Sequence, residues 1–123
     1  MKKMIIFIRR KPGISKSEFR AHYENVHAAL VTSTFDSIGG YVRNYIEEEA
    51  SSVGWAQQRE ADFDVITELW FRDDQAYVEF LADLGNAEKV APLRSDEATF
   101  LDSDTIQTFL VSESGTSLHH SEI

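Results

Sequence analysis

"FDVITELWF", residues 63–71, is the clearest strand signal in the sequence, because it predicts a β-strand with large apolar side chains on both faces. One face carries Phe63, Val65, Thr67, Leu69 and Phe71, and the other carries Asp64, Ile66, Glu68 and Trp70. The run "KMIIFIRR", residues 3–10, is continuously apolar between basic ends and predicts a second strand of the same kind. Both faces of the resulting sheet must therefore be covered.

Two helices are expected between the strands. "SKSE", residues 15–18, matches a capping box, so a helix should begin at Lys16. Its predicted buried stripe is Phe19, Tyr23, Val26 and Leu30. A second helix is expected over residues 74–84 with Asp74 as its N-cap. Residues 85–97 are predicted to be irregular, with one further helical turn, capped by Ser95 or Asp96, that ends at Phe100.

Two more strands complete the expected fold. Aromatic and β-branched residues predict them at 41–48 and 105–113. The order βαββαβ is that of an α+β, ferredoxin-like domain with a four-stranded antiparallel sheet and two helices on one face. The other sheet face is most simply covered by a second copy, which predicts a homodimer. We expect the domain to span residues 1–113, a mobile tail to follow at 114–123, and the polar segment 48–62 to be a long, functional or mobile loop.

Composition narrows the possible functions. The 123 residues include 21 acidic and 12 basic side chains, giving a net charge of −9, which argues against nucleic-acid and anionic-membrane partners. Cysteine is absent from the sequence, which excludes disulfides and thiolate chemistry. The apolar run from Met4 to Ile8 is too short for a signal peptide, and no apolar run could span a bilayer. We therefore expect a cytoplasmic protein.

Two histidines stand out in the first predicted helix, in "HYENVHAAL", residues 22–30. On an α-helical wheel His27 lies about 40° from Tyr23, at the flank of the buried stripe. His22 lies about 60° to the other side, which predicts that the two imidazoles cannot serve one small site. From the residues alone, the favoured interpretation of His27 is a half-buried histidine near a helix end, where the helix dipole favours its charged form.

Several segments together resemble the EthD-like family. The segments are "RRKPGISKSEFRAHYENVHAALV", "GYVRNYI", "DFDVITELWF" and "SDEATFLD", and the resemblance runs over about residues 3 to 113. It implies a dimeric α+β barrel like those of polyketide cyclases, muconolactone isomerase and small cofactor-free monooxygenases. EthD-like members include dehydratases and decarboxylases that act on aromatic polyketides. The resemblance maps the family's functional histidine onto His27, which would act as a general acid and base.

The resemblance also suggests residues that bind the substrate. Asn44 matches an asparagine often seen in the family, and a buried asparagine could hold a substrate oxygen or a loop carbonyl. Glu68 belongs to an Asp…Glu-x-Trp-Phe strand, and either Asp64 or Glu68 could orient a histidine or a substrate hydroxyl. Alternatively, these two carboxylates pair with Arg43 or Arg9 on neighbouring strands. Tyr23, Tyr45 and Trp70 are expected in the core or as the walls of an aromatic cleft.

Signals for bound metals or cofactors are weak in this sequence. His-x-x-x-His is missing, His119 and His120 lie in the tail, and no glycine-rich phosphate loop follows a strand. The expected protein is therefore a cofactor-independent lyase, a dehydratase or decarboxylase, or an isomerase, acting on a small aromatic or polyketide-like molecule. The alternatives are a cofactor-free monooxygenase and a non-catalytic protein that binds a small ligand in the same cleft.

Overall fold

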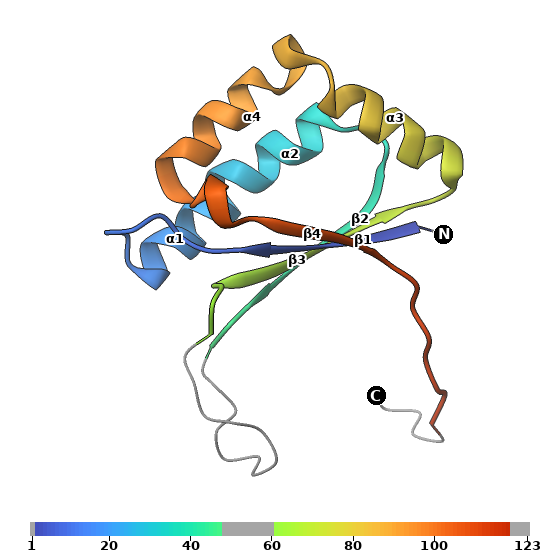
Figure 1. Ribbon diagram of the computed structural model, residues 1–123, viewed down its shortest axis with the longest axis horizontal. Helices are drawn as coiled ribbons and strands as arrows, with labels where there is room; N and C mark the ends of the chain where they lie inside the picture. The colour runs from blue at the N-terminus through green and yellow to red at the C-terminus, as the bar shows by residue number, and fades with distance from the viewer. Residues whose placement is uncertain (1, 48–60, 119–123) are drawn as a thin grey trace.

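The computed structural model describes residues 2–47 and 61–118, and its elements follow the order of a ferredoxin-like α+β domain (Figure 1). The strands are β1 (Lys2–Ile8), β2 (Ile38–Tyr45), β3 (Val65–Phe71) and β4 (Gln107–Val111). The helices are α1 (Lys16–His22), α2 (Ala28–Thr34), α3 (Asp74–Leu84) and α4 (Ala87–Phe100). A π-helical turn, η1 (Tyr23–His27), joins α1 to α2, and a short 3₁₀ turn, η3 (Ser103–Thr105), precedes β4. The predicted fold class is confirmed.

The four strands form one antiparallel sheet in the order β2-β3-β1-β4. The helices lie together on one side of it (Figure 1). β3 alternates as its sequence predicts: Val65, Thr67, Leu69 and Phe71 are buried toward the helices, and the residues between them are partly exposed. The sheet therefore has one face packed against the helices and one open face.

Two apolar clusters pack between the sheet and the helices. The first holds Val31, Phe35, Leu69, Phe71, Phe80, Val90 and Leu93. The second holds Ile8, Phe19, Tyr23, Val65, Phe100 and Leu101. The first cluster packs β3 against α2 and α4, and the second packs β3 against η1 and α4. The helices are therefore held against β3, an inner strand of the sheet, at both ends of that strand.

The buried stripe of the first helical segment differs from the prediction. Phe19 and Tyr23 are buried, but His27 and Val31 then take the places that we predicted for Val26 and Leu30. Val26 is 41% exposed. The reason is η1, in which the amide of Ala28 donates to the carbonyl of Tyr23, five residues back. This wider turn takes in one extra residue, so every later side chain is rotated relative to a regular α-helix.

The bounds of α4, α3 and β2 also differ from those predicted. Residues 87–97 are helical rather than irregular, because α4 is capped by Asn86, and its burial of Val90, Leu93 and Phe100 holds the helix together despite Pro92 inside it. The N-cap of α3 is Asp73, not Asp74: its side chain accepts from the amide of Ala76 at 2.8 Å. β2 begins at Ile38, before the predicted start at residue 41, so Gly39 and Gly40 lie within the strand, at a register shift.

Part of the prediction falls outside the described residues. Most of the 48–62 loop and His119 and His120 lie there, and the domain and tail boundaries stay predictions. Within residues 2–47 and 61–118, no helix is long and apolar enough to cross a membrane. The cytoplasmic location stays a prediction.

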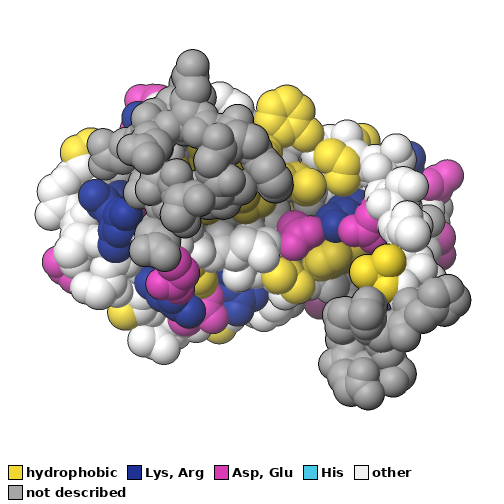
Figure 2. Space-filling model, turned by 90° about the horizontal axis from the view of Figure 1, so that it is seen from below, with side chains coloured by type: hydrophobic (Ala, Val, Ile, Leu, Met, Phe, Trp, Pro, Cys, Tyr) yellow, Lys and Arg dark blue, Asp and Glu magenta, His cyan; other side chains and the backbone are white. Residues whose placement is uncertain are grey.

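The open face of the sheet carries apolar side chains around a small ionic cluster. Figure 2 views the molecule from this side and shows hydrophobic side chains with acidic and basic ones among them. Lys3, only 8% exposed, pairs through its Nζ with Glu68 at 2.7 Å and Glu113 at 2.6 Å, and lies over the ring of Trp70. Phe109, on β4, is 51% exposed and packs edge-on against Phe7.

Replacement of Phe71 by alanine should lower the free energy of unfolding by about 3–5 kcal/mol, because Phe71 is fully buried in the first cluster. Its ring packs against those of Phe80 and Tyr77. Urea unfolding followed by circular dichroism measures the change. Val78→Ala is the control, since Val78 is 56% exposed on α3 and its loss should change stability by less than about 0.5 kcal/mol. Equal losses in the two variants would contradict this account of the core.

Candidate active site

A cavity of about 290 Å³ lies between the sheet and the helices. Its walls are mainly apolar: Met4, Ile6, Ile8, Val31, Phe35, Leu69, Phe80, Leu84, Leu93, Leu101 and Ile106. The polar side chains that line it are His27, Tyr23, Tyr41, Thr67, Thr108, Arg94 and Glu97. An apolar cavity with a few converging polar groups is the usual form of a small-molecule site.

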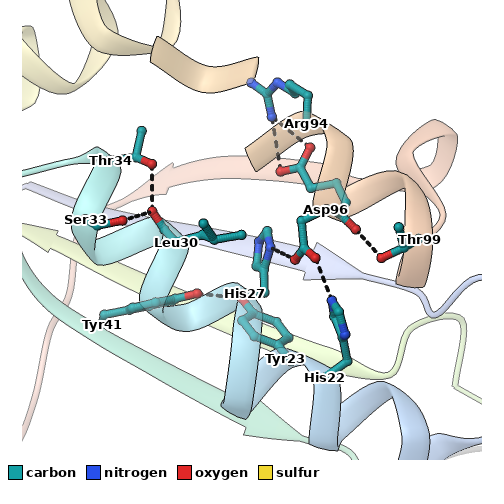
Figure 3. A network of polar contacts seen from close by, with 11 residues as sticks. His22, Tyr23, His27, Leu30, Ser33, Thr34, Tyr41, Arg94, Asp96 and Thr99 are labelled. Carbon is teal, nitrogen blue, oxygen red and sulfur yellow. Dashed lines mark hydrogen bonds and ion pairs between the residues drawn. The ribbon is translucent and has the colours of Figure 1, made fainter. Parts of the chain in front are cut away.

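His27 is held at this cavity by a carboxylate from α4. Its Nδ1 lies 3.0 Å from Oδ2 of Asp96, and the side chain of Asp96 is 11% exposed. The other oxygen of Asp96, Oδ1, lies 2.7 Å from Nε2 of His22 (Figure 3). One carboxylate therefore bridges both imidazoles. The prediction that the two histidines could not serve one small site was wrong.

The π-helical turn explains how the two histidines meet. On a regular α-helix, residues five apart point about 140° away from each other. In η1 the chain closes its hydrogen bond over five residues, so His22 and His27 come to the same side of the segment. The two histidines are five positions apart in the sequence, which is the span of one π-helical hydrogen bond. The sequence predicts Asp96 only as a helix cap, because the segment before it is predicted to be irregular.

The hydrogen bond to Asp96 gives His27 a defined form. A carboxylate accepts a hydrogen bond from the imidazole, so Nδ1 carries the hydrogen and Nε2 is left as the acceptor. Burial lowers the pKa of His27 below its ordinary value, and this effect outweighs the hydrogen bond that His27 donates to Asp96, which raises the pKa. His27 is only 4% exposed. Near pH 7 it is thus a neutral imidazole able to take up a proton.

Three hydroxyl groups lie beside His27 on the sheet side of the cavity. The Tyr23 Oη lies 2.8 Å from the Thr67 Oγ1, and the hydroxyl of Tyr41 donates to the Tyr23 Oη at 3.0 Å. The rings of Tyr23 and His27 pack edge to face with centroids 5.2 Å apart (Figure 3). Burial raises the pKa of Tyr23 and of Tyr41, so both stay protonated. Thr67 and Tyr41 were missing from the predicted site, although strand alternation placed Thr67 on the face opposite Glu68.

Three of the predicted substrate-binding residues lie on the opposite face of the sheet from His27. Asn44 donates from Nδ2 to Glu68 at 2.9 Å, and Glu68 pairs with Lys3. Trp70 packs under the same lysine. Because side chains alternate along a strand, Asn44, Glu68 and Trp70 cannot reach the cavity on the helix side. If they bind a ligand, they do so at the open face.

Tyr45 shares the helix-facing side of β2 but does not line the cavity. Its ring meets that of Tyr23, while its hydroxyl donates to Glu24. Arg43 holds the same carboxylate through two bonds of 2.8 Å, and this contact lowers the pKa of Glu24 to about 2. Asp64 pairs with Arg10, not with Arg9 or Arg43.

In residues 2–47 and 61–118, no three or more His, Cys, Asp or Glu side chains gather in a way that could hold a metal ion.

Comparison with known proteins places this geometry in a family. The family model described as the EthD domain matches residues 11–104, a span that contains His22, His27 and Asp96. The chain belongs to the EthD family. It is 29% identical over 101 residues to a protein named dehydratase aurZ from Gibberella zeae. That match covers 76% of this chain but only 64% of the length of that relative.

Solved structures show the same fold at low sequence identity. An EthD-family protein from Bacillus halodurans superposes with a TM-score of 0.62 at 18% identity, over 93% of this chain and 100% of that one. HapK from Hahella chejuensis has a TM-score of 0.59 at 18% identity, over 96% of this chain and 99% of that one. A protein from Arabidopsis thaliana has a TM-score of 0.60 at 14% identity, over 96% of this chain and 100% of that one. These likenesses concern the fold alone.

The buried neutral state of His27 should make stability depend on pH. Its pKa in the folded protein lies below its ordinary value of 6.5, so below about pH 6.5 the unfolded chain binds a proton on this imidazole before the folded protein does. The stability that neutral His27 contributes is therefore present above pH 6.5 and is lost as the pH falls. Urea unfolding of wild type and His27→Gln between about pH 8 and pH 5 checks this. As the pH falls, the free energy of unfolding of wild type should decrease relative to that of His27→Gln. A difference between the two proteins that stays constant with pH would contradict this prediction.

Proposed function

We propose that this protein is a cofactor-independent lyase of the dehydratase type, acting on a small aromatic or polyketide-like β-hydroxy ketone. The observation that carries the proposal is the buried His27, fixed through Nδ1 by Asp96 at an otherwise apolar cavity. The 29% identity to a dehydratase favours loss of water over decarboxylation or isomerisation. A cavity of about 290 Å³ with apolar walls suits a flat, hydrophobic molecule.

The proposed reaction has two proton transfers, both at Nε2 of His27. First, Nε2 removes a proton from the carbon beside the substrate carbonyl, and the electron pair of that C–H bond moves toward the carbonyl to form an enolate. The imidazolium then gives its proton to the β-hydroxyl as the C–O bond breaks. Water leaves, and the new C=C bond is conjugated with the ketone. Asp96 accepts the hydrogen bond from Nδ1 throughout and stabilises the imidazolium in between.

His22 has a supporting place in this scheme. It holds the second oxygen of Asp96 at 2.7 Å and packs on the ring of Phe100, which also contacts His27. Its side chain is 30% exposed, whereas that of His27 is 5% exposed. His22 thus orients the carboxylate that orients the base, and it is a positioning residue.

Replacement of His27 by glutamine should slow proton removal from a ketone by about 10²- to 10⁴-fold. The measurement is deuterium uptake at the carbon beside the carbonyl of 1-tetralone in D₂O, followed by NMR, since this needs only the first half of the reaction. Thr32→Ala is the control on the same helical segment, because Thr32 is exposed and bonds only to nearby backbone carbonyls. Wild-type exchange no faster than buffer would count against the enzyme and favour a ligand-binding protein.

We also propose that the protein is a homodimer joined through the open faces of two sheets. The open face exposes Val42 and Phe109, at 42% and 51%, on opposite edges of the sheet. Between them, Lys3 is already neutralised by Glu68 and Glu113, so the centre of the face can be covered without leaving an unpaired charge. A second copy supplies a face of matching composition.

Phe109→Glu should weaken self-association by roughly tenfold or more, because it would bury a carboxylate in an apolar contact. Light scattering over a concentration series gives the mass. Val78→Glu is the matched control, since Val78 is similarly exposed, at 56%, but lies on α3 on the other side of the molecule. A monomeric wild type, or equal weakening in both variants, would overturn the dimer proposal.

A further inference from the structure

Three hydroxyl groups form a short relay in the wall of the cavity: Tyr41, Tyr23 and Thr67. They come from β2, η1 and β3, which are separate parts of the chain. Tyr23 is 2% and Thr67 is 1% exposed, so bulk water does not compete for their hydrogen bonds. Two bonds join them: Tyr41 Oη to Tyr23 Oη at 3.0 Å, and Tyr23 Oη to Thr67 Oγ1 at 2.8 Å.

A proton count shows what this relay can still do. Three hydroxyls carry three protons, and the two bonds between them use two. Within the described residues these are the hydrogen bonds that the three hydroxyls make. One O–H donor is therefore left to serve the cavity, which all three residues line. A buried donor without an acceptor is costly, so an oxygen atom of a bound molecule is its natural partner.

The free proton is best assigned to Tyr23. Tyr41 donates to its oxygen, and Thr67 can do the same, because either atom of the Tyr23–Thr67 pair could be the donor. A phenol is also a stronger donor than an aliphatic hydroxyl, and two incoming hydrogen bonds strengthen it further. We propose that Tyr23, polarised by Tyr41 and Thr67, donates a hydrogen bond to the carbonyl oxygen of the substrate, keeps its proton, and stabilises the enolate that forms there.

This inference rests on the proposed function and narrows its substrate to a neutral ketone. The donor lies beside His27, with ring centroids 5.2 Å apart, so one molecule can meet Tyr23 with its oxygen and His27 with the adjacent carbon. Arg94, the cation on the wall of the cavity, is already paired with Glu97 at 2.9 and 3.1 Å. A substrate carboxylate would therefore lack a free cation among the described lining residues, whereas a ketone needs only the one neutral donor.

The test compares two bicyclic probes of the same shape, 1-tetralone, which has a carbonyl, and tetralin, which lacks it. Binding is measured by NMR titration in the His27→Gln protein, so that proton removal plays no part. 1-Tetralone should bind roughly 3- to 10-fold more tightly, the value of one hydrogen bond. Its infrared carbonyl band should move to lower wavenumber on binding. Adding Tyr23→Phe should abolish both effects, and adding Tyr41→Phe should weaken them.

Tyr77→Phe is the matched control, because Tyr77 lies on α3 and is not among the residues that line the cavity. It should leave both the preference and the band shift unchanged. The inference is overturned if 1-tetralone shows no preference in the His27→Gln protein, or if the preference survives Tyr23→Phe. A clear preference together with no deuterium exchange in wild type would support the Tyr23 donor and contradict the proposed lyase. Deuterium exchange that is unaffected by Tyr23→Phe would support the proposed lyase and contradict the Tyr23 donor.

Discussion

The hydrogen bond from the amide of Ala28 to the carbonyl of Tyr23 is the contact on which the site depends. It widens one helical turn by a residue and rotates everything that follows. Without that rotation, Val26 would face the sheet and His27 would lie at the edge of the buried stripe. With it, His27 is buried, Asp96 bridges both histidines, and Val31 continues the core. A local change in helix type thus determines both the packing and the chemistry.

Much of the fold could be predicted from the sequence, because strand alternation and helix capping are local properties. The N-cap at Ser15 and the alternation of residues 65–71 both appear as expected. The π turn could not be read in this way, since a helical wheel assumes 3.6 residues per turn throughout. The role of Asp96 was hidden for another reason: Pro92 and the polar residues before it resemble a loop, and only tertiary burial makes them a helix.

At the centre of the sheet, the two faces carry different kinds of polar group. On the helix side, the hydroxyls of Tyr23, Tyr41 and Thr67 are neutral and hydrogen-bond to one another. On the open side, Lys3 and Glu68 are ionised, and each has an opposite charge within 3 Å. This division follows from desolvation: a neutral donor can be buried at little cost, whereas a charge needs a partner or water. The sequence-based site mixed the two groups by placing Asn44, Glu68 and Trp70 with His27.

The wide turn also shows how the helix could absorb a change in chain length. The buried residues Phe19, Tyr23, His27 and Val31 are each four positions apart, a spacing that a regular α-helix cannot keep on one face for long. If the exposed Val26 were deleted, the same four side chains would be spaced by four, three and four, which is the ordinary α-helical repeat. The segment can therefore be regarded as an α-helix that carries a one-residue insertion. Insertions usually accumulate in loops, but here the helix itself contains one, directly beside the proposed base.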